Sequence, residues 1–420
     1  MSPLLATARF PPPEFSETGH VLPTLAGPAA RALSLELLDV AVLAVALALA
    51  AWLSLRARSR RGLVWLGLFS LLYFGFWRKG CICSIGSIQN VAQALFDPSY
   101  AVPLSVLAFA VLPLLAALFF GRAFCAGVCP HGALQDLMLI KPIQLPTWLE
   151  RSLRLLAYAY LGLALIFAAT GGGYIICAYD PFVPLFRLGG SPAMVTTGIV
   201  LLGLGLFVGR PYCRFLCPYG VLLGFAARVS RWRVTVTPDT CTQCRLCEQA
   251  CPFGALTPAT LDPRPRNLIS DKRRLALLFV LLPLVISASV WLGGLSAEAM
   301  ARRHRLVSLS ERIHLEDTAV IADRTDASAA FRALGEPAET LHAEARTLRG
   351  RYTLAGRLGG GWVGLVLGVT LISQSVRRHR RDYEADRMDC LSCARCFKSC
   401  PQELQRLGVP VTIHPRPGSA

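Results

Sequence analysis

Two copies of one cysteine motif constrain this chain more than any other feature. Both copies read C-x-x-C-x-x-C-x-x-x-C-P. The first comprises Cys241, Cys244, Cys247, Cys251 and Pro252, and the second comprises Cys390, Cys393, Cys396, Cys400 and Pro401. Four thiolates at this spacing are typical ligands of a [4Fe–4S] cluster, whereas zinc sites usually need only paired C-x-x-C units, often with His. The motifs therefore predict two iron–sulfur clusters and one-electron redox chemistry.

The composition indicates a membrane protein. Only 16% of the 420 residues are charged, against about 25% in soluble proteins. The net charge of +17 comes largely from basic residues beside apolar runs, where such residues act as orientation signals. No nucleic-acid-binding motif accompanies the charge, so we expect no nucleic-acid partner.

Seven apolar runs are candidate membrane helices, since a span needs roughly 20 apolar residues. We therefore predict an all-α integral membrane helical bundle of about seven spans. The runs cover residues 37–55, 62–77, 101–121, 153–170, 194–209, 275–294 and 358–375.

Positive charge predicts the orientation of these spans. The loop after the first run contains Arg56, Arg58, Arg60 and Arg61, which favours the cytoplasmic side. Alternation then places the C-terminus in the cytoplasm and the N-terminus in the periplasm. No cleavable signal peptide is evident, so the first run is expected to act as an uncleaved anchor.

These boundaries predict a layout with the two motifs on the same side of the membrane. The expected order is an extended periplasmic arm (1–36), a membrane bundle (37–235), the first ferredoxin motif (236–262), a membrane helix (275–294), a small periplasmic helical domain (295–357), a membrane helix (358–376) and a cytoplasmic tail with the second motif (377–420).

The two motifs can then fold together as one cytoplasmic, two-cluster, ferredoxin-like module that is split across the sequence. In two-cluster ferredoxins the fourth cysteine of each run binds the other run's cluster. By that rule Cys251 joins Cys390, Cys393 and Cys396, while Cys400 joins Cys241, Cys244 and Cys247. Two self-contained clusters are the alternative.

The chain also contains an internal repeat. Residues 121–134 read GRAFCAGVCPHGAL and residues 209–222 read GRPYCRFLCPYGVL, an offset of 88. The paired cysteines, Cys125 with Cys129 and Cys213 with Cys217, are four apart, which stacks both sulfurs on one face of a helix. We expect the pairs to converge on a four-thiolate site. The pattern leaves open a metal, a cluster, a reversible disulfide or plain apolar packing.

Three further cysteines, Cys81, Cys83 and Cys177, are expected near the outer face. They are candidates for a redox relay, a disulfide or structural roles. A relay is attractive because the hydrocarbon core is about 30 Å thick, too far for one electron-transfer step from a cytoplasmic cluster. Haem is disfavoured because among seven histidines only His131 comes near a helix end.

The motifs together resemble the NosR/NapH-type polytopic membrane iron–sulfur proteins over roughly residues 35–405. The stretches GRAFCAGVCPHGALQD, GRPYCRFLCPYG and DYEADRMDCLSCARCFKSCP look most like the NosR branch without its flavin-binding domain. The resemblance implies a multi-pass protein of the bacterial inner membrane. It further implies that the eight ferredoxin cysteines bind [4Fe–4S] clusters and that any flavin is supplied by a partner.

The function that this resemblance implies is membrane electron transfer, as a component of an oxidoreductase system rather than as a stand-alone enzyme. Electrons would move between a quinol or cytoplasmic donor and a periplasmic flavoprotein or reductase, with membrane lipid around the spans. The alternative is redox-dependent reduction of copper, or assembly of a cuproenzyme. A redox sensor is a third interpretation.

Overall fold

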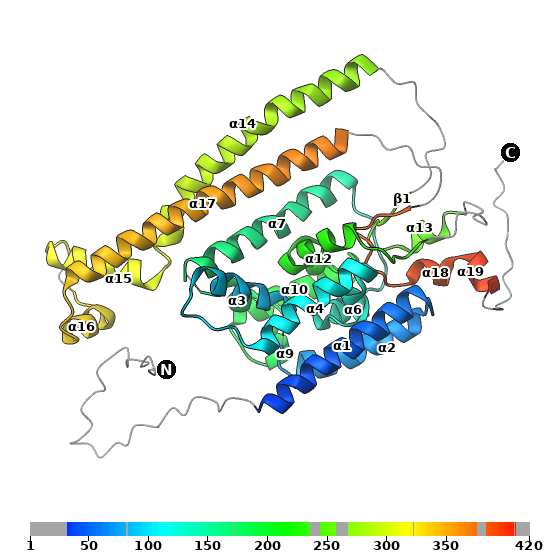
Figure 1. Ribbon diagram of the computed structural model, residues 1–420, viewed down its shortest axis with the longest axis horizontal. Coiled ribbons are helices and arrows are strands. Elements are labelled where there is room, and N and C mark those ends of the chain that lie inside the picture. The colour runs from blue at the N-terminus through cyan, green and yellow to red at the C-terminus, as the bar shows by residue number, and fades with distance from the viewer. Residues whose placement is uncertain are drawn as a thin grey trace.

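The computed structural model is mostly helical (Figure 1). It describes residues 32–80, 83–171, 173–235, 244–257, 268–321, 323–375, 384–406 and 408. Residues 1–31 of the expected periplasmic arm, Cys81 and Cys241 lie outside this part of the chain.

Within the described residues, four helices are long and apolar enough to cross a membrane, which confirms the membrane character. They are α1 (Leu33–Leu55), α7 (Thr147–Ala169), α14 (Leu268–Ala301) and α17 (Ala338–Ser375). The other three predicted spans correspond to shorter elements. Two are α4 (Leu104–Phe120) and α10 (Pro192–Gly205), and the third divides into α2 (Arg60–Ser70) and the π-helix η1 (Leu71–Trp77).

Short helices connect and cap these elements. They are α3 (Ser84–Phe96), α5 (Ala123–Gly127), α6 (Pro130–Met138), α8 (Ile175–Tyr179), α9 (Val183–Arg187), α11 (Pro211–Phe215) and α12 (Pro218–Arg228). One continuous core runs from α1 and α3 through the repeat cysteines to Cys247 and Cys251 of the first ferredoxin motif. The cysteine-bearing segments thus form part of the bundle core.

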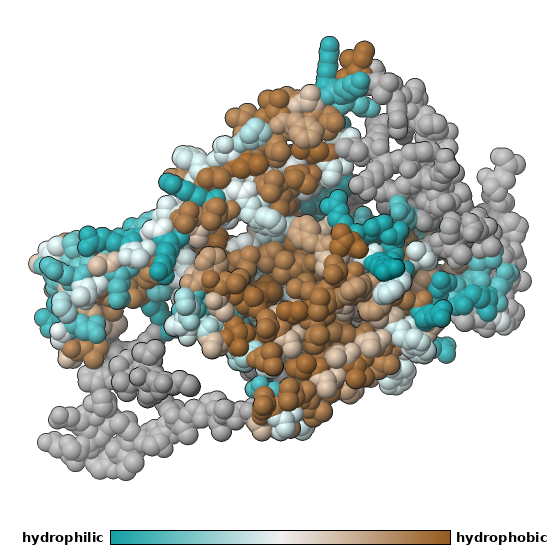
Figure 2. Space-filling model, in the orientation of Figure 1, coloured by the Kyte–Doolittle hydropathy of each residue, from teal (hydrophilic) through white to brown (hydrophobic). Residues whose placement is uncertain are grey.

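A helical hairpin made of α14 and α17 lies beside this bundle, with α17 between α14 and α7 (Figure 1). Glycine permits the close approach of the two helices. A Cβ atom at Gly360 would lie 2.1 Å from the Ser289 carbonyl oxygen, and one at Gly293 would lie 2.2 Å from that of Gly356. The outer side of α14 exposes large apolar side chains (Figure 2), as expected of a helix in lipid.

The segment predicted as a small helical domain at 295–357 is instead shared with the two hairpin helices. Helix α14 continues to Ala301 and α17 begins at Ala338. Only α15 (Arg305–Asp317) and α16 (Asp326–Ala333) are separate, and they pack on the start of α17 through a small core of Ile313, Phe331 and Leu341.

The two ferredoxin motifs form one unit, which lies toward the end of the hairpin away from α15 and α16 (Figure 1). Strand β1 (Leu256–Thr257) pairs antiparallel with β2 (Glu384–Ala385), with Leu256 opposite Ala385. Helix α13 (Leu246–Ala250) of the first motif packs against α18 (Arg395–Ser399) of the second, which α19 (Pro401–Arg406) follows. The pairing confirms that the split motifs fold together.

Candidate functional site: a ferredoxin unit seated on the repeated cysteines

The two motifs of the ferredoxin unit have the same local backbone. In each, the residue after the second cysteine has a left-handed conformation, Arg245 with φ 62° and Ala394 with φ 59°, and begins a five-residue helix. The matched geometry is what two equivalent cluster-binding loops require.

Four cysteines from both motifs line one cavity in this unit. They are Cys251 from the first motif and Cys390, Cys393 and Cys396 from the second, the same set that the crossed arrangement predicts. Burial raises the pKa of Cys390 to about 12 and also raises that of Cys251. At neutral pH thiols with a raised pKa stay protonated, and binding to a metal centre would convert them to thiolates. The donor set therefore fits an iron–sulfur cluster.

The remaining ferredoxin cysteines are placed less completely. Cys244 is exposed and Cys247 is buried on α13, while Cys400 ends α18. Within the described residues no three His, Cys, Asp or Glu side chains converge closely enough for a single metal ion.

The repeats also share one order of short helices, but it differs from the continuous helix predicted from the cysteine spacing. In each copy a five-residue helix ends before the second cysteine, and a new helix begins at Pro130 or Pro218. Cys129 and Cys217 have extended backbone at these breaks, with ψ of 118° and 110°. The prediction of a single helical face is wrong because a residue before proline avoids the helical conformation and proline favours the first helical position.

The four repeat cysteines nevertheless come together. All are buried, and the Cys129 thiol is close enough to Cys125, Cys213 and Cys217 for their charges to interact. The four thiols therefore lie in one buried region, at the junction of α5, α6, α11 and α12, and a shared four-thiolate site stays a prediction. Cys125 and Cys213 lie within the short helices α5 and α11, whereas Cys129 and Cys217 precede the first residues of α6 and α12.

Each repeat places its arginine against the glycine of the other. A Cβ atom at Gly132 would lie 3.1 Å from Nη1 of Arg210, and one at Gly220 would lie 3.0 Å from Nη2 of Arg122. The glycines recur because a larger residue would crowd these guanidinium groups. Two positive charges thus lie beside the four cysteines, where they favour thiolates over thiols.

The ferredoxin unit rests directly on the repeats. Arg122 donates to the carbonyl of Met388 at 2.9 Å, and Arg214 donates to the carbonyls of Pro252 and Phe253 at 3.3 and 3.1 Å. Gly209 permits this contact, since a Cβ atom there would lie 2.9 Å from the Pro252 oxygen. Among the described residues, direct contacts therefore join the segments that carry the two cysteine groups.

Arg210 and Asp136 connect the two groups electrostatically. The Arg210 guanidinium is close enough to Cys125 and Cys213 of the repeats, and to Cys393 of the ferredoxin unit, for their charges to interact. Asp136 pairs with Arg210 at 3.3 Å and with Arg395 at 3.1 Å, and also with Arg60. Burial disfavours its charge, but the three guanidinium groups hold the pKa of Asp136 well below its usual range.

A buried polar group lies on the far side of the repeat cysteines. His131 Nε2 is 3.0 Å from Asp180 Oδ2, and the Tyr212 hydroxyl donates to the same oxygen at 3.4 Å. Ionisable groups inside a membrane bundle are rare and usually functional. From the sequence, we considered His131 only as a possible haem ligand. Asp180, which follows an apolar stretch, was a signal that a buried partner exists.

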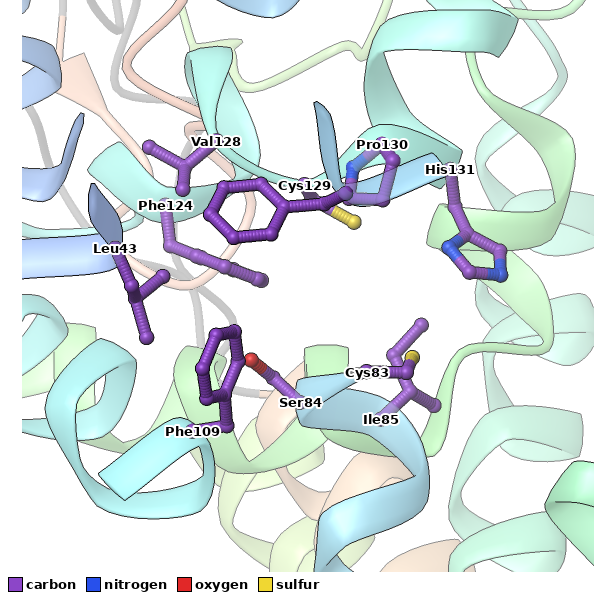
Figure 3. A pocket seen from close by; sticks show the side chains of 11 residues that line it. Leu43, Cys83, Ser84, Ile85, Phe109, Phe124, Val128, Cys129, Pro130 and His131 are labelled. Carbon is purple, nitrogen blue, oxygen red and sulfur yellow. The ribbon is translucent and has the colours of Figure 1, made fainter. Parts of the chain in front are cut away.

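Cys83 and Cys177 are placed near this polar group rather than with the repeat cysteines. The Cys83 thiol interacts with the charges of Asp180 and Cys177, and a Cβ atom at Gly86 would lie 3.0 Å from the Cys177 sulfur. Figure 3 shows a cavity with Cys129 and His131 on one side and Cys83 on the other. The cavity thus separates the two groups of membrane cysteines.

Comparison with known protein families supports the iron–sulfur assignment. Residues 102–152 and 191–237, which hold the two repeats, match a family described as a 4Fe-4S binding domain, and residues 234–257 match a second family of that description. This chain contains segments that match ferredoxin-type 4Fe-4S binding domains, and it is similar to NosR and MauN. The predicted resemblance is confirmed.

The related proteins cover this iron–sulfur protein only in part. An uncharacterized protein of Methanocaldococcus jannaschii is 29% identical over 46% of this chain and 82% of its own length. The methylamine utilization ferredoxin-type protein MauN of Methylobacillus flagellatus is 29% identical over 38% of this chain and 58% of its own. The regulatory protein NosR of Pseudomonas aeruginosa is 29% identical over 45% of this chain and 29% of its own. No solved structure matches the chain.

Proposed function

We propose that this protein carries electrons across the bacterial inner membrane through three cysteine-held sites. Two are [4Fe–4S] clusters of the ferredoxin unit, one held by Cys251, Cys390, Cys393 and Cys396 and the other by Cys241, Cys244, Cys247 and Cys400. The third is a thiolate-held cluster at Cys125, Cys129, Cys213 and Cys217. Iron–sulfur clusters supply one-electron carriers when bound.

The observation that carries the proposal is the position of Arg210. Its buried guanidinium interacts with the charges of Cys393 in the ferredoxin unit and of Cys125 and Cys213 in the repeats. One side chain thus lies between the two cysteine groups, and the contacts of Arg122 and Arg214 fix the ferredoxin unit against the repeats. Such close seating is needed for electron transfer and is not needed for two independent metal sites.

The outer cysteines extend the proposed route. Cys83 and Cys177, with Cys81, are candidates for a last relay toward a periplasmic acceptor, because the cavity of Figure 3 lies between Cys83 and Cys129. The proposed topology has seven spans, a periplasmic N-terminus and a cytoplasmic C-terminus. We further propose a quinol or cytoplasmic donor and a periplasmic flavoprotein or reductase as acceptor.

The ligand assignment is tested by iron analysis and electron paramagnetic resonance of the reduced full chain. We expect more than about eight Fe per chain if the repeats also hold a cluster, since two [4Fe–4S] clusters contribute about eight. Cys251→Ser should alter the same resonance as Cys393→Ser, because the crossed arrangement puts both at one cluster. If Cys251→Ser instead matches Cys244→Ser, the clusters are self-contained.

Transmembrane electron flow is tested in vesicles that contain the full chain and a trapped electron acceptor. Cys125→Ser with Cys213→Ser should abolish reduction of the trapped acceptor and keep the ferredoxin resonances. Ala126→Ser, a buried change on the same short helix, is the matched control and should leave the flow intact. Unchanged flow in the double variant contradicts the conduit, and restoration of partner activity by added copper would favour the assembly factor.

A further inference from the structure

Gln135 is a buried amide that contacts one sulfur of the repeat cysteines. It lies on α6 with no exposed surface. Its Nε2 donates to the Cys213 sulfur at 3.2 Å and to the His131 carbonyl at 2.9 Å, while its Oε1 accepts from the Tyr212 backbone N–H at 3.0 Å. Three partners thus hold the amide in one position.

The orientation of this amide follows from its partners. The Tyr212 backbone N–H can only donate and the His131 carbonyl can only accept. The amide oxygen must therefore face Tyr212 and the NH2 group must face His131. An amide flipped by 180° would break both bonds, so the N–H that reaches Cys213 is determined by the surrounding backbone.

This contact breaks the symmetry of the repeats. The offset of 88 pairs Gln135 with Leu223, which is also buried and has no hydrogen-bond donor in its side chain. The second cysteines remain alike, because the Cys217 sulfur accepts from the Gly220 backbone N–H and the Cys129 sulfur accepts from that of Gly132. Cys213 alone receives an amide side chain, whereas its counterpart Cys125 has the Arg122 guanidinium at 3.8 Å.

We propose that Gln135 is a positioning residue that sets the reduction potential of the group held by the four repeat cysteines. The inference rests on the proposed function, which places a redox group there. A reduced centre carries one more negative charge than the oxidised centre, and a hydrogen bond to a ligating sulfur stabilises the more negative form. The N–H of Gln135 therefore raises the potential, and it does so on one side of the site only.

The test is a redox titration of the full chain in lipid nanodiscs, followed by electron paramagnetic resonance. The membrane signal is first identified as the one that Cys213→Ser removes. Gln135→Leu, which copies the second repeat, and Gln135→Met, which keeps the length without the donor, are then titrated. We expect both to lower the potential, with about a tenfold fall in the reduced-to-oxidised ratio at fixed potential, or about 59 mV for one electron.

The outcomes separate this inference from the proposed function. An unchanged potential in both variants overturns the role of Gln135 and leaves the membrane site standing. Loss of the membrane signal in both, with intact ferredoxin signals, also overturns it, because Gln135 would then be needed only for structure. If the Cys213→Ser variant has the same resonances as the wild-type protein, the membrane site itself is overturned.

Discussion

The two repeats have the same order of short helices but different chemistry. Both copies place a five-residue helix, an extended cysteine and a proline-initiated helix in the same order. In the first copy, the helix that follows contains His131, Gln135 and Asp136, all buried or nearly so. The corresponding positions of the second copy are Tyr219, Leu223 and Gly224.

The residues at these three positions make different contacts in the two copies. In the first copy, they bind Asp180, the Cys213 sulfur and three arginines. In the second, Tyr219 donates to the Ala110 carbonyl at 2.8 Å, Leu223 packs in the core and Gly224 lies against Met388. The duplication thus builds a common frame for four cysteines, and at these three positions only the first copy provides groups that bind Asp180, the Cys213 sulfur and the arginines.

The largest difference is expected at Asp136. Replacing it with Asn removes the charge that three guanidinium groups share, one of them the buried Arg210. Breaking such a buried pair should lower the free energy of unfolding by about 3 kcal/mol. Denaturant unfolding in detergent, followed by tryptophan fluorescence, measures the loss.

Asp389→Asn is the matched control, since Asp389 pairs with Arg154 but is 25% exposed. Its cost should stay below about 1 kcal/mol. Equal losses in the two variants would mean that the Asp136 network contributes nothing special to the first repeat.

The sequence was sufficient to predict which cysteines belong together, but not which side chains contact them. The offset of 88 located all four repeat cysteines, and the crossed-ligand rule placed Cys251 with the second motif, as the shared cavity has it. The pairing of Arg122 with Gly220 and of Arg210 with Gly132 could not be read, because it depends on how two distant segments pack. Proline at the start of the second helix was a legible signal for the break at Cys129 and Cys217.

Hydropathy found the apolar helices but misplaced some ends. It placed the start of the last span at residue 358, whereas α17 begins at Ala338, because hydropathy detects contact with lipid and not the continuity of a helix. The loop arginines show a related ambiguity. Arg58 and Arg60 served as orientation signals, yet Arg58 pairs with Glu403 at 2.7 Å and Arg60 with Asp136. The same charges can orient the bundle and fix the ferredoxin unit against it.

A smaller difference is expected between His131 and Tyr219. His131→Phe leaves the buried Asp180 Oδ2 with only the Tyr212 hydroxyl at 3.4 Å, which should cost about 2 kcal/mol. Tyr219→Phe removes one hydrogen bond to a carbonyl, at a cost of about 1 kcal/mol. The same unfolding measurement compares them, and a larger loss at Tyr219 would contradict the assignment of the polar role to the first copy.

The smallest effect should be the same in both repeats. Gly132→Val and Gly220→Val each crowd the guanidinium of the other repeat, since even a Cβ atom would lie 3.1 or 3.0 Å from it. Because the side chain can shift, we expect overpacking to cost each variant about 1 kcal/mol. Gly203→Val is the control, since a Cβ atom there meets nothing within 4 Å, and it should not lower stability by overpacking. Unequal losses at Gly132 and Gly220 would show that the symmetry of the frame ends at the cysteines, because those two glycines are its nearest shared contacts.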